Sequence, residues 1–313
     1  MTLLVFRNLA GLAISATSPI AQRKRDQKRY KPNFLKIFLP ISFVVASLIA
    51  SSNLMAQAPS HEDAVASREN QPVKITVKTS LDSKHQLELN YPVPVRVNQI
   101  LSDSVVNINQ LPLSQEQTKL VSSNDIFWTG AALFERFPHP QKQRVVNQLK
   151  QLASVGKREW EEEQSQAAFK LAAYIENLKV GQRIFTPLDY DIVRIEPAKN
   201  PLVNNDMTLV LPSRPSTVLI TGAVTEPKVV SWQERGNANS YLKHAVTLNN
   251  SANSEVWVIQ PDGQVEQHPI AYWNQKHFEI APGATIYLGF SSLPDEFNTI
   301  NEDIVNLLRN RAP

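Results

Sequence analysis

Asp189 and Asp191 come closest to an acid–base pair in this sequence, with Arg183 before them and Arg194 after them. Residues two apart on a strand face the same side, so the two carboxyl groups could lie together as the carboxylates of a glycosidase do. Pro187 lies just before them, and the segment equally fits a turn in which the arginines form local ion pairs. We favour the structural interpretation. The alternative is a polysaccharide-modifying enzyme that uses Asp189 and Asp191.

The sequence contains no other recognisable catalytic or metal-binding pattern. Its histidines lie apart from one another and lack metal-ligand spacing such as H-E-x-x-H, and there is no G-x-S-x-G, Walker or dinucleotide motif. The absence of cysteine excludes disulfides, thiolate metal sites and a cysteine nucleophile. We therefore assign no catalytic residue, no metal site and no cofactor. The histidines considered are His61, His85, His139, His244, His268 and His277.

Tryptophan is the remaining residue type whose chemistry suits sugars, because a flat ring can stack on the apolar face of a pyranose. Tryptophans in small sheets more often belong to the core, so a sugar-stacking platform is the second interpretation. The five tryptophans are Trp128, Trp160, Trp232, Trp257 and Trp273.

The first 58 residues have the pattern of an export signal. A basic region ends at Lys36, a mostly apolar run of fourteen residues spans Ile37 to Ala50, and small residues follow it. The run is shorter than the ~20 residues of a transmembrane helix. We predict cleavage near Ala56 or Ala58 and a periplasmic mature protein without a transmembrane span. The alternative is an uncleaved inner-membrane anchor.

The charge distribution argues against nucleic acid as a partner. The whole chain has a formal charge of +3, but residues 1–58 hold eight basic side chains against one acidic side chain, Asp26. The remaining chain is therefore net acidic, which makes nucleic acid a poor partner.

Residues 73–212 have the pattern of a small sheet with helices inserted in it. Val73–Lys78 and Gln86–Tyr91 alternate with period two, as half-buried strands do. Between about 138 and 179 the apolar residues fall at helical spacing, with a break at Gly156, which predicts a helical hairpin. Further patterns predict a short helix at 99–102 and strands at 126–128, 183–186 and 192–195.

A stiff joint is predicted where Pro212 and Pro215 bracket Ser213 and Arg214. Two β-branched runs, Met207–Leu211 and Thr217–Thr221, are separated by Pro212 and Pro215, and proline cannot donate to a central ladder. The first run would end one sheet and the second would begin another.

Residues 216–292 predict a second unit. After the strand at 217–221 come a helix at 241–246, a hairpin with a Pro261–Gly263 turn, and a final strand at Thr285–Leu288. This is the element order of a β-grasp fold.

From about Val73 to its end, the chain resembles the GfcC-like family of periplasmic capsule and exopolysaccharide biosynthesis proteins. The best match is the run from Leu211 to Val218 ending in Gly222–Val224, and Asn205–Asp206 stands where the family often has Gly-Asp. Other matching positions are Gly181, Arg183, Asp189, Arg194, Asn200–Leu202, Pro261–Gly263 and Pro282–Gly283. Four charged residues within these motifs form a candidate polar cluster for binding or for structure: Arg183, Asp189, Arg194 and Arg214.

The resemblance implies an α+β protein with two tandem β-grasp domains of the SLBB or ubiquitin-like kind. They would span 73–212 and 216–292, with the helical hairpin inserted in the first and a C-terminal amphipathic helix at 293–313. It also implies an accessory role in polysaccharide export, by protein or glycan binding rather than catalysis. An outer-membrane protein and a lipoprotein of the same pathway would be its partners, with polysaccharide as a candidate ligand.

The tail itself predicts an amphipathic helix from Asp295 to Arg311, with Asp295 as its N-cap. Its apolar stripe must dock on this protein or on a partner, and we favour docking within the chain. The stripe comprises Phe297, Ile300, Ile304, Leu307 and Leu308.

Overall fold

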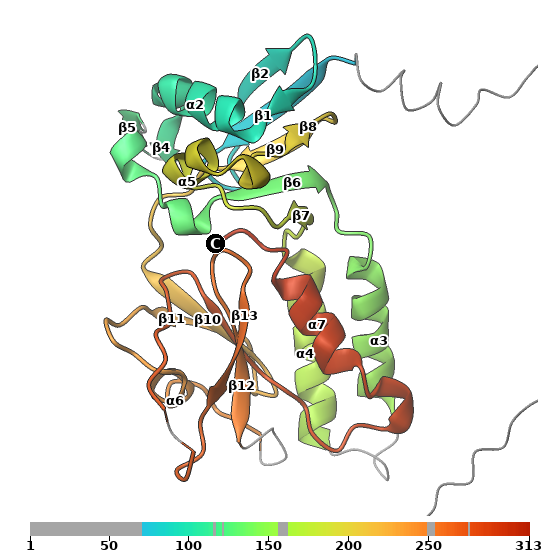
Figure 1. Ribbon diagram of the computed structural model, residues 1–313. Coiled ribbons are helices and arrows are strands. Elements are labelled where there is room, and N and C mark those ends of the chain that lie inside the picture. Colours follow the sequence, from blue (N-terminus) through green and yellow to red (C-terminus); the bar gives the residue numbers. More distant parts are fainter. Residues whose placement is uncertain (1–70, 115–116, 121, 156–161, 249–253, 275) are drawn as a thin grey trace, which may run out of the picture. The chain divides into compact units, whose positions relative to one another are not determined.

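The computed structural model describes residues 71–313 apart from 115–116, 121, 156–161, 249–253 and 275. The predicted export signal, the helix break at Gly156 and Trp160 lie outside the described residues. The described chain is mixed α+β and contains two five-stranded sheets together with several helices (Figure 1).

The first sheet has the strand order β2-β1-β9-β6-β7. Its central pair, β1 and β9, is parallel, and its other neighbouring strands are antiparallel. The period-two pattern of β1 buries Val73, Ile75 and Val77, as the sequence predicted. The strands are β1 (Val73–Lys78), β2 (Leu87–Tyr91), β6 (Ala132–Arg136), β7 (Gln182–Ile184) and β9 (Met207–Val210).

The second sheet has the order β11-β10-β14-β12-β13. Its central pair, β10 and β14, is again parallel, and the other neighbours are antiparallel. Numbered from its own first strand, each sheet therefore runs second, first, fifth, third, fourth. The strands are β10 (Thr217–Gly222), β11 (Lys228–Ser231), β12 (Glu255–Ile259), β13 (Val265–Pro269) and β14 (Thr285–Leu288).

In each sheet a helix follows the second strand. The helix α2 (Val97–Asn107) follows β2 and packs against it, and α6 (Ala238–Leu242) follows β11. The helix α2 is longer than the predicted 99–102, and α6 ends where the predicted helix at 241–246 began. The short elements beside the first sheet are β3 (Val95–Arg96), β4 (Pro112–Ser114), β5 (Gln117–Leu120), β8 (Leu202–Val203), η1 (Ile108–Gln110), η2 (Ser123–Asp125), η3 (Trp128–Gly130) and η4 (Pro197–Lys199).

The predicted helical hairpin is present between β6 and β7, as α3 (Lys142–Ser154) and α4 (Glu162–Asn177). Glu162 and Glu163 occupy the first turn of α4, where negative charge favours the helix dipole. The hairpin joins the second sheet's hydrophobic core, where α4 contacts β10 and α3 contacts the C-terminal helix α7 (Ile300–Leu308). Figure 1 shows α3, α4 and α7 side by side.

Two strands predicted from the first half are wrong. Residues 192–195 belong to the helix α5 (Tyr190–Ile195). This helix has six residues and buries only Val193, so it is too short for its buried residues to recur at helical spacing. At 126–128, Ile126 makes only an isolated bridge to Ser213, and Trp128 begins η3. The strand of this region is β6, which begins at Ala132.

The joint between the sheets lies where the two prolines predicted it, between β9 and β10. Backbone hydrogen bonds hold it from both sides, because Phe127 N donates to Pro212 O at 2.7 Å and Trp232 N donates to Ser216 O at 2.7 Å.

The C-terminal helix begins later than predicted. Asp295 lies in a 3-10 turn, η5 (Asp295–Phe297), and α7 starts after Thr299, so the prediction that Asp295 caps the helix is wrong. The turn already places Phe297 in the core before the α-helix begins. All five side chains of the predicted stripe are buried within this chain, in the core that also holds α3, α4 and the second sheet.

Candidate functional site

A cleft of about 480 Å³ lies where the joint meets the second sheet. Its walls come from segments far apart in the sequence: Phe127 and Thr129 at η3, Arg214 in the joint, Trp232 after β11, the β12–β13 hairpin, and residues 278–282 before β14. We call this pocket the joint cleft.

Aromatic rings and one arginine form one wall of the joint cleft. The guanidinium carbon of Arg214 lies 5.5 Å from the ring centroid of Phe127 and 5.3 Å from that of Trp232. Trp232 is partly buried, and its Nε1 donates to Ile280 O at 2.8 Å, which fixes the orientation of the indole. At an exposed site each cation–π contact contributes about 0.5–1 kcal/mol. The wall is therefore preformed while Arg214 stays accessible.

Carboxylates and amides also line the joint cleft. Gln260 Nε2 donates to Glu266 Oε2 at 3.0 Å and to the backbone oxygen of Glu279 at 3.0 Å. Glu266 also contacts Nε2 of the buried His268 at 2.7 Å, and the imidazole stacks on Phe278. Asp262 accepts from Gln264 N at 2.9 Å and shapes the hairpin turn. These bonds hold the polar groups in fixed positions.

This combination of groups suits a hydroxyl-rich ligand. An aromatic wall can accept the apolar face of a sugar ring, while charged and amide groups exchange hydrogen bonds with its hydroxyls. Concave sites that join apolar surface to a few fixed polar groups are the usual form of small-molecule sites.

The four residues of the predicted polar cluster do not converge on one site. Arg214 lines the joint cleft. Arg183, on β7, is 7% exposed and donates to three backbone oxygens, those of Pro261 at 2.9 Å, Ala131 at 3.0 Å and Arg311 at 3.3 Å. Burial lowers the pKa of Arg183 to about 10. It therefore ties the first sheet to the β12–β13 turn and to the C-terminal tail.

Asp189 and Arg194 lie at α5. Asp189 is the N-cap of that helix, and its Oδ1 accepts from Asp191 N at 2.9 Å and Ile192 N at 3.2 Å. Arg194 is exposed, pairs with Asp191 at 3.6 Å and lies over the ring of Tyr190. Asp189 and Asp191 also line a smaller pocket of about 300 Å³.

The tryptophans have different environments. Trp232 lines the joint cleft, and Trp257 packs on Tyr287 with ring centroids 5.8 Å apart, whereas Trp273 is 77% exposed. Sequence reasoning did not find that Trp232 and Phe127 both lie against Arg214, because these residues are distant in the chain. The one local signal was the arginine between two prolines.

Two family models match the chain. The model for the N-terminal part of the capsule-biosynthesis protein GfcC matches residues 73–214, and that for its C-terminal part matches residues 226–313. The chain is also 31% identical over 206 residues to the uncharacterized protein YjbG of Escherichia coli (strain K12), covering 63% of this chain and 80% of that protein. The chain therefore belongs to the GfcC capsule-biosynthesis family, which confirms the resemblance found in the sequence. Membership indicates a role in capsule or polysaccharide biosynthesis.

Two further observations apply to the described residues. No helix among them is both long enough and apolar enough to cross a bilayer. Across the same ranges, no three His, Asp or Glu side chains are grouped as metal ligands would be.

Proposed function

We propose that this protein is an accessory component of capsule or exopolysaccharide biosynthesis and export, and that it binds glycan in the joint cleft. The observation that carries the proposal is the joint cleft itself, in which Arg214 lies over the rings of Phe127 and Trp232 and which fixed carboxylates and amides also line. Membership of the capsule-biosynthesis family supports a glycan as the ligand.

Each sheet, we propose, is a β-grasp fold and the core of a domain, spanning 73–212 and 216–292, followed by the C-terminal helix. The shared strand order supports this, as do the parallel central pair and the helix that follows the second strand of each sheet. A joint held from both sides would keep the cleft walls at a fixed separation.

The candidate carboxyl groups already make structural contacts, which favours binding over catalysis. Asp189 caps α5, Asp191 pairs with Arg194, and Glu266 is engaged by Gln260 and His268. A polysaccharide-modifying enzyme that uses Asp189 and Asp191 stays the alternative, because both line a pocket.

The test of glycan binding is a Trp232→Ala variant, titrated calorimetrically with oligosaccharides from the polysaccharide of the producing strain. Removing the ring should weaken binding by about tenfold or more, which is about 1.4 kcal/mol. Trp273→Ala is the matched control, because it removes an exposed tryptophan outside the cleft. Equal affinity in both variants and the parent would refute the proposed site.

We also propose that the mature protein is periplasmic and that its partners are an outer-membrane protein and a lipoprotein of the same pathway. N-terminal sequencing of the protein from the periplasmic fraction should begin near Gln57 or Pro59. A full-length species retained in the inner membrane would contradict this. Crosslinking in cells followed by mass spectrometry should recover both partners, and recovery of neither would refute that part.

A further inference from the structure

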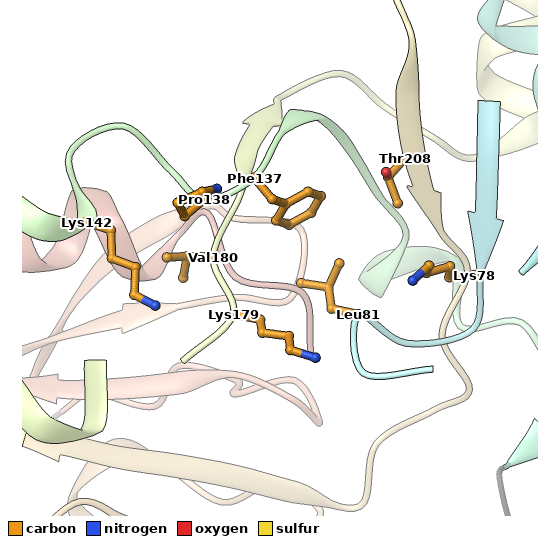
Figure 2. Close-up of a pocket in the computed structure, with 8 residues that line it drawn as sticks. All are labelled: Lys78, Leu81, Phe137, Pro138, Lys142, Lys179, Val180 and Thr208. Atoms are coloured by element: carbon orange, nitrogen blue, oxygen red, sulfur yellow. The ribbon is translucent and has the colours of Figure 1, made fainter. Parts of the chain in front are cut away.

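A second pocket, of about 340 Å³, lies among the end of β1, the chain after β6, the start of α3 and the segment between α4 and β7. Three lysines line it, Lys78, Lys142 and Lys179, and its described lining includes no acidic side chain. Figure 2 shows the three lysines around the side chains of Phe137 and Leu81. We call this pocket the lysine pocket.

The ammonium groups are held in place by backbone or ionic contacts and keep N–H donors to spare. Lys142 Nζ donates to the backbone oxygens of Glu176 and Leu178 at 2.8 Å, at the C-terminal end of α4. Lys78 Nζ donates to Ser83 O at 3.2 Å, and Lys179 pairs with Asp82. Each ammonium carries three N–H groups, so every one of the lysines retains at least one beyond these contacts.

An aromatic ring forms the apolar part of the lysine pocket. Phe137 is 41% exposed, and its ring packs on Phe134 with centroids 4.9 Å apart. Gly181 lies directly behind it, and a Cβ at that position would come within 2.7 Å of Phe137 Cζ and 2.8 Å of Phe134 Cδ1. The glycine therefore lets the ring occupy its place beside the lysines.

We propose that the lysine pocket binds a carboxylate-bearing sugar unit, such as a hexuronate, with the C–H face of the sugar on Phe137 and its carboxylate among the ammonium groups. Lys179 is paired with Asp82, whereas Lys78 and Lys142 contact backbone oxygens. A neutral sugar would leave the charges of Lys78 and Lys142 unused, and a bare inorganic anion would leave the ring unused. The choice of a sugar as ligand rests on the glycan-binding role proposed above. The inference nevertheless concerns a different pocket, and it makes an acidic polysaccharide the ligand.

The test is an NMR titration of the ¹⁵N-labelled purified protein with methyl glucuronide and methyl glucoside, which differ in the carboxylate at C6. The glucuronide should shift amide signals of residues 137–142 and 178–181 and bind about tenfold more tightly than the glucoside, with an advantage that shrinks as salt is raised. Equal binding of the two compounds, or shifts confined to the joint cleft, would overturn the proposal.

Two variants separate charge from shape. The double variant Lys78→Gln, Lys179→Gln should weaken glucuronide binding about tenfold, whereas the charge-matched control Lys150→Gln, Lys243→Gln, outside the pocket, should change it less than about twofold. Gly181→Ala keeps every charge but displaces Phe137, so it should weaken glucuronide binding while folding is verified by circular dichroism. Inorganic phosphate that competes as strongly as glucuronide would refute the sugar as ligand.

The outcome is independent of the joint cleft. Trp232→Ala should leave glucuronide binding at the lysine pocket unchanged. Failure of oligosaccharides to bind the cleft, with glucuronide still bound here, would remove the proposed function and leave this inference standing.

Discussion

Replacing Arg183 by Met tests whether this side chain is a structural tie rather than a binding group. Met keeps much of the length and apolar volume but removes the guanidinium, which donates to the backbone oxygens of Pro261, Ala131 and Arg311. Because these oxygens belong to three separate segments, loss of the three hydrogen bonds should loosen the contacts of β7 with the second sheet and with the tail.

The expected loss in the free energy of unfolding follows from two opposing contributions. Hydrogen bonds to a charged group contribute about 1.5–3 kcal/mol each, so three amount to about 4.5–9 kcal/mol. Burial opposes them, because it lowers the pKa of Arg183 from 12.5 to about 10, which corresponds to roughly 3 kcal/mol. The expected net loss in the free energy of unfolding is about 3 kcal/mol, or a fall of about 6–12 °C in Tm.

Urea and thermal unfolding followed by circular dichroism would measure this loss, provided that the transitions are two-state. Arg194→Met is the matched control, because Arg194 is exposed, and its replacement should change stability by less than about 0.5 kcal/mol. A loss at Arg183 below about 1 kcal/mol, or equal losses in both variants, would refute the reasoning.

The double substitution Ile304→Asp, Leu307→Asp should abolish or strongly lower thermal stability, because both side chains are buried in the core. Unchanged stability with lost secretion would mean that the helix docks on a partner. Asp189→Ala with Asp191→Ala should cost about 1 kcal/mol through the lost N-cap and leave secretion near normal, whereas a folded double variant without secretion would favour the enzyme. Burial raises the pKa of the Tyr287 phenol well above 10.0 in the folded protein. The phenol therefore contributes fully to the stability of the fold below pH 10, and this contribution is lost as the pH rises, because the same phenol ionises first in the unfolded chain. The free energy of unfolding should therefore fall above pH 10, and less steeply in Tyr287→Phe; identical pH profiles would contradict this.

Local pattern alone determined the elements whose burial repeats within one segment. The strand β1 and the final strand β14 have the predicted bounds, and the pair α3 and α4 occupies the region where apolar residues recur at helical spacing. At β1 and in the two helices the prediction succeeded because their side chains alternate between core and solvent with a fixed period. All four residues of β14 are buried, and that strand was indicated instead by the Pro282–Gly283 turn before it. The sequence also determined the absence of cysteine chemistry and the family, because both depend on residue identity alone.

The short elements were missed in the sequence because they contain too few residues for a hydrophobic period to appear. The six residues of α5 complete fewer than two turns, and the cap at Asp189, rather than an apolar repeat, marks where the helix starts. At β6, buried residues are consecutive from Ala132 to Phe134, so the strand has no alternation to detect.

Only the tertiary structure decided which surfaces meet. The α3–α4 hairpin lies between two strands of the first sheet in the chain, yet its apolar side chains complete the core of the second sheet and cover α7. Arg183 reaches Pro261 and Arg311, 78 and 128 positions away, and Arg214 lies between Phe127 and Trp232. Periodicity indicates that a side chain is buried but not which residues it packs against. These long-range contacts therefore arise only when the sheets and the hairpin pack together.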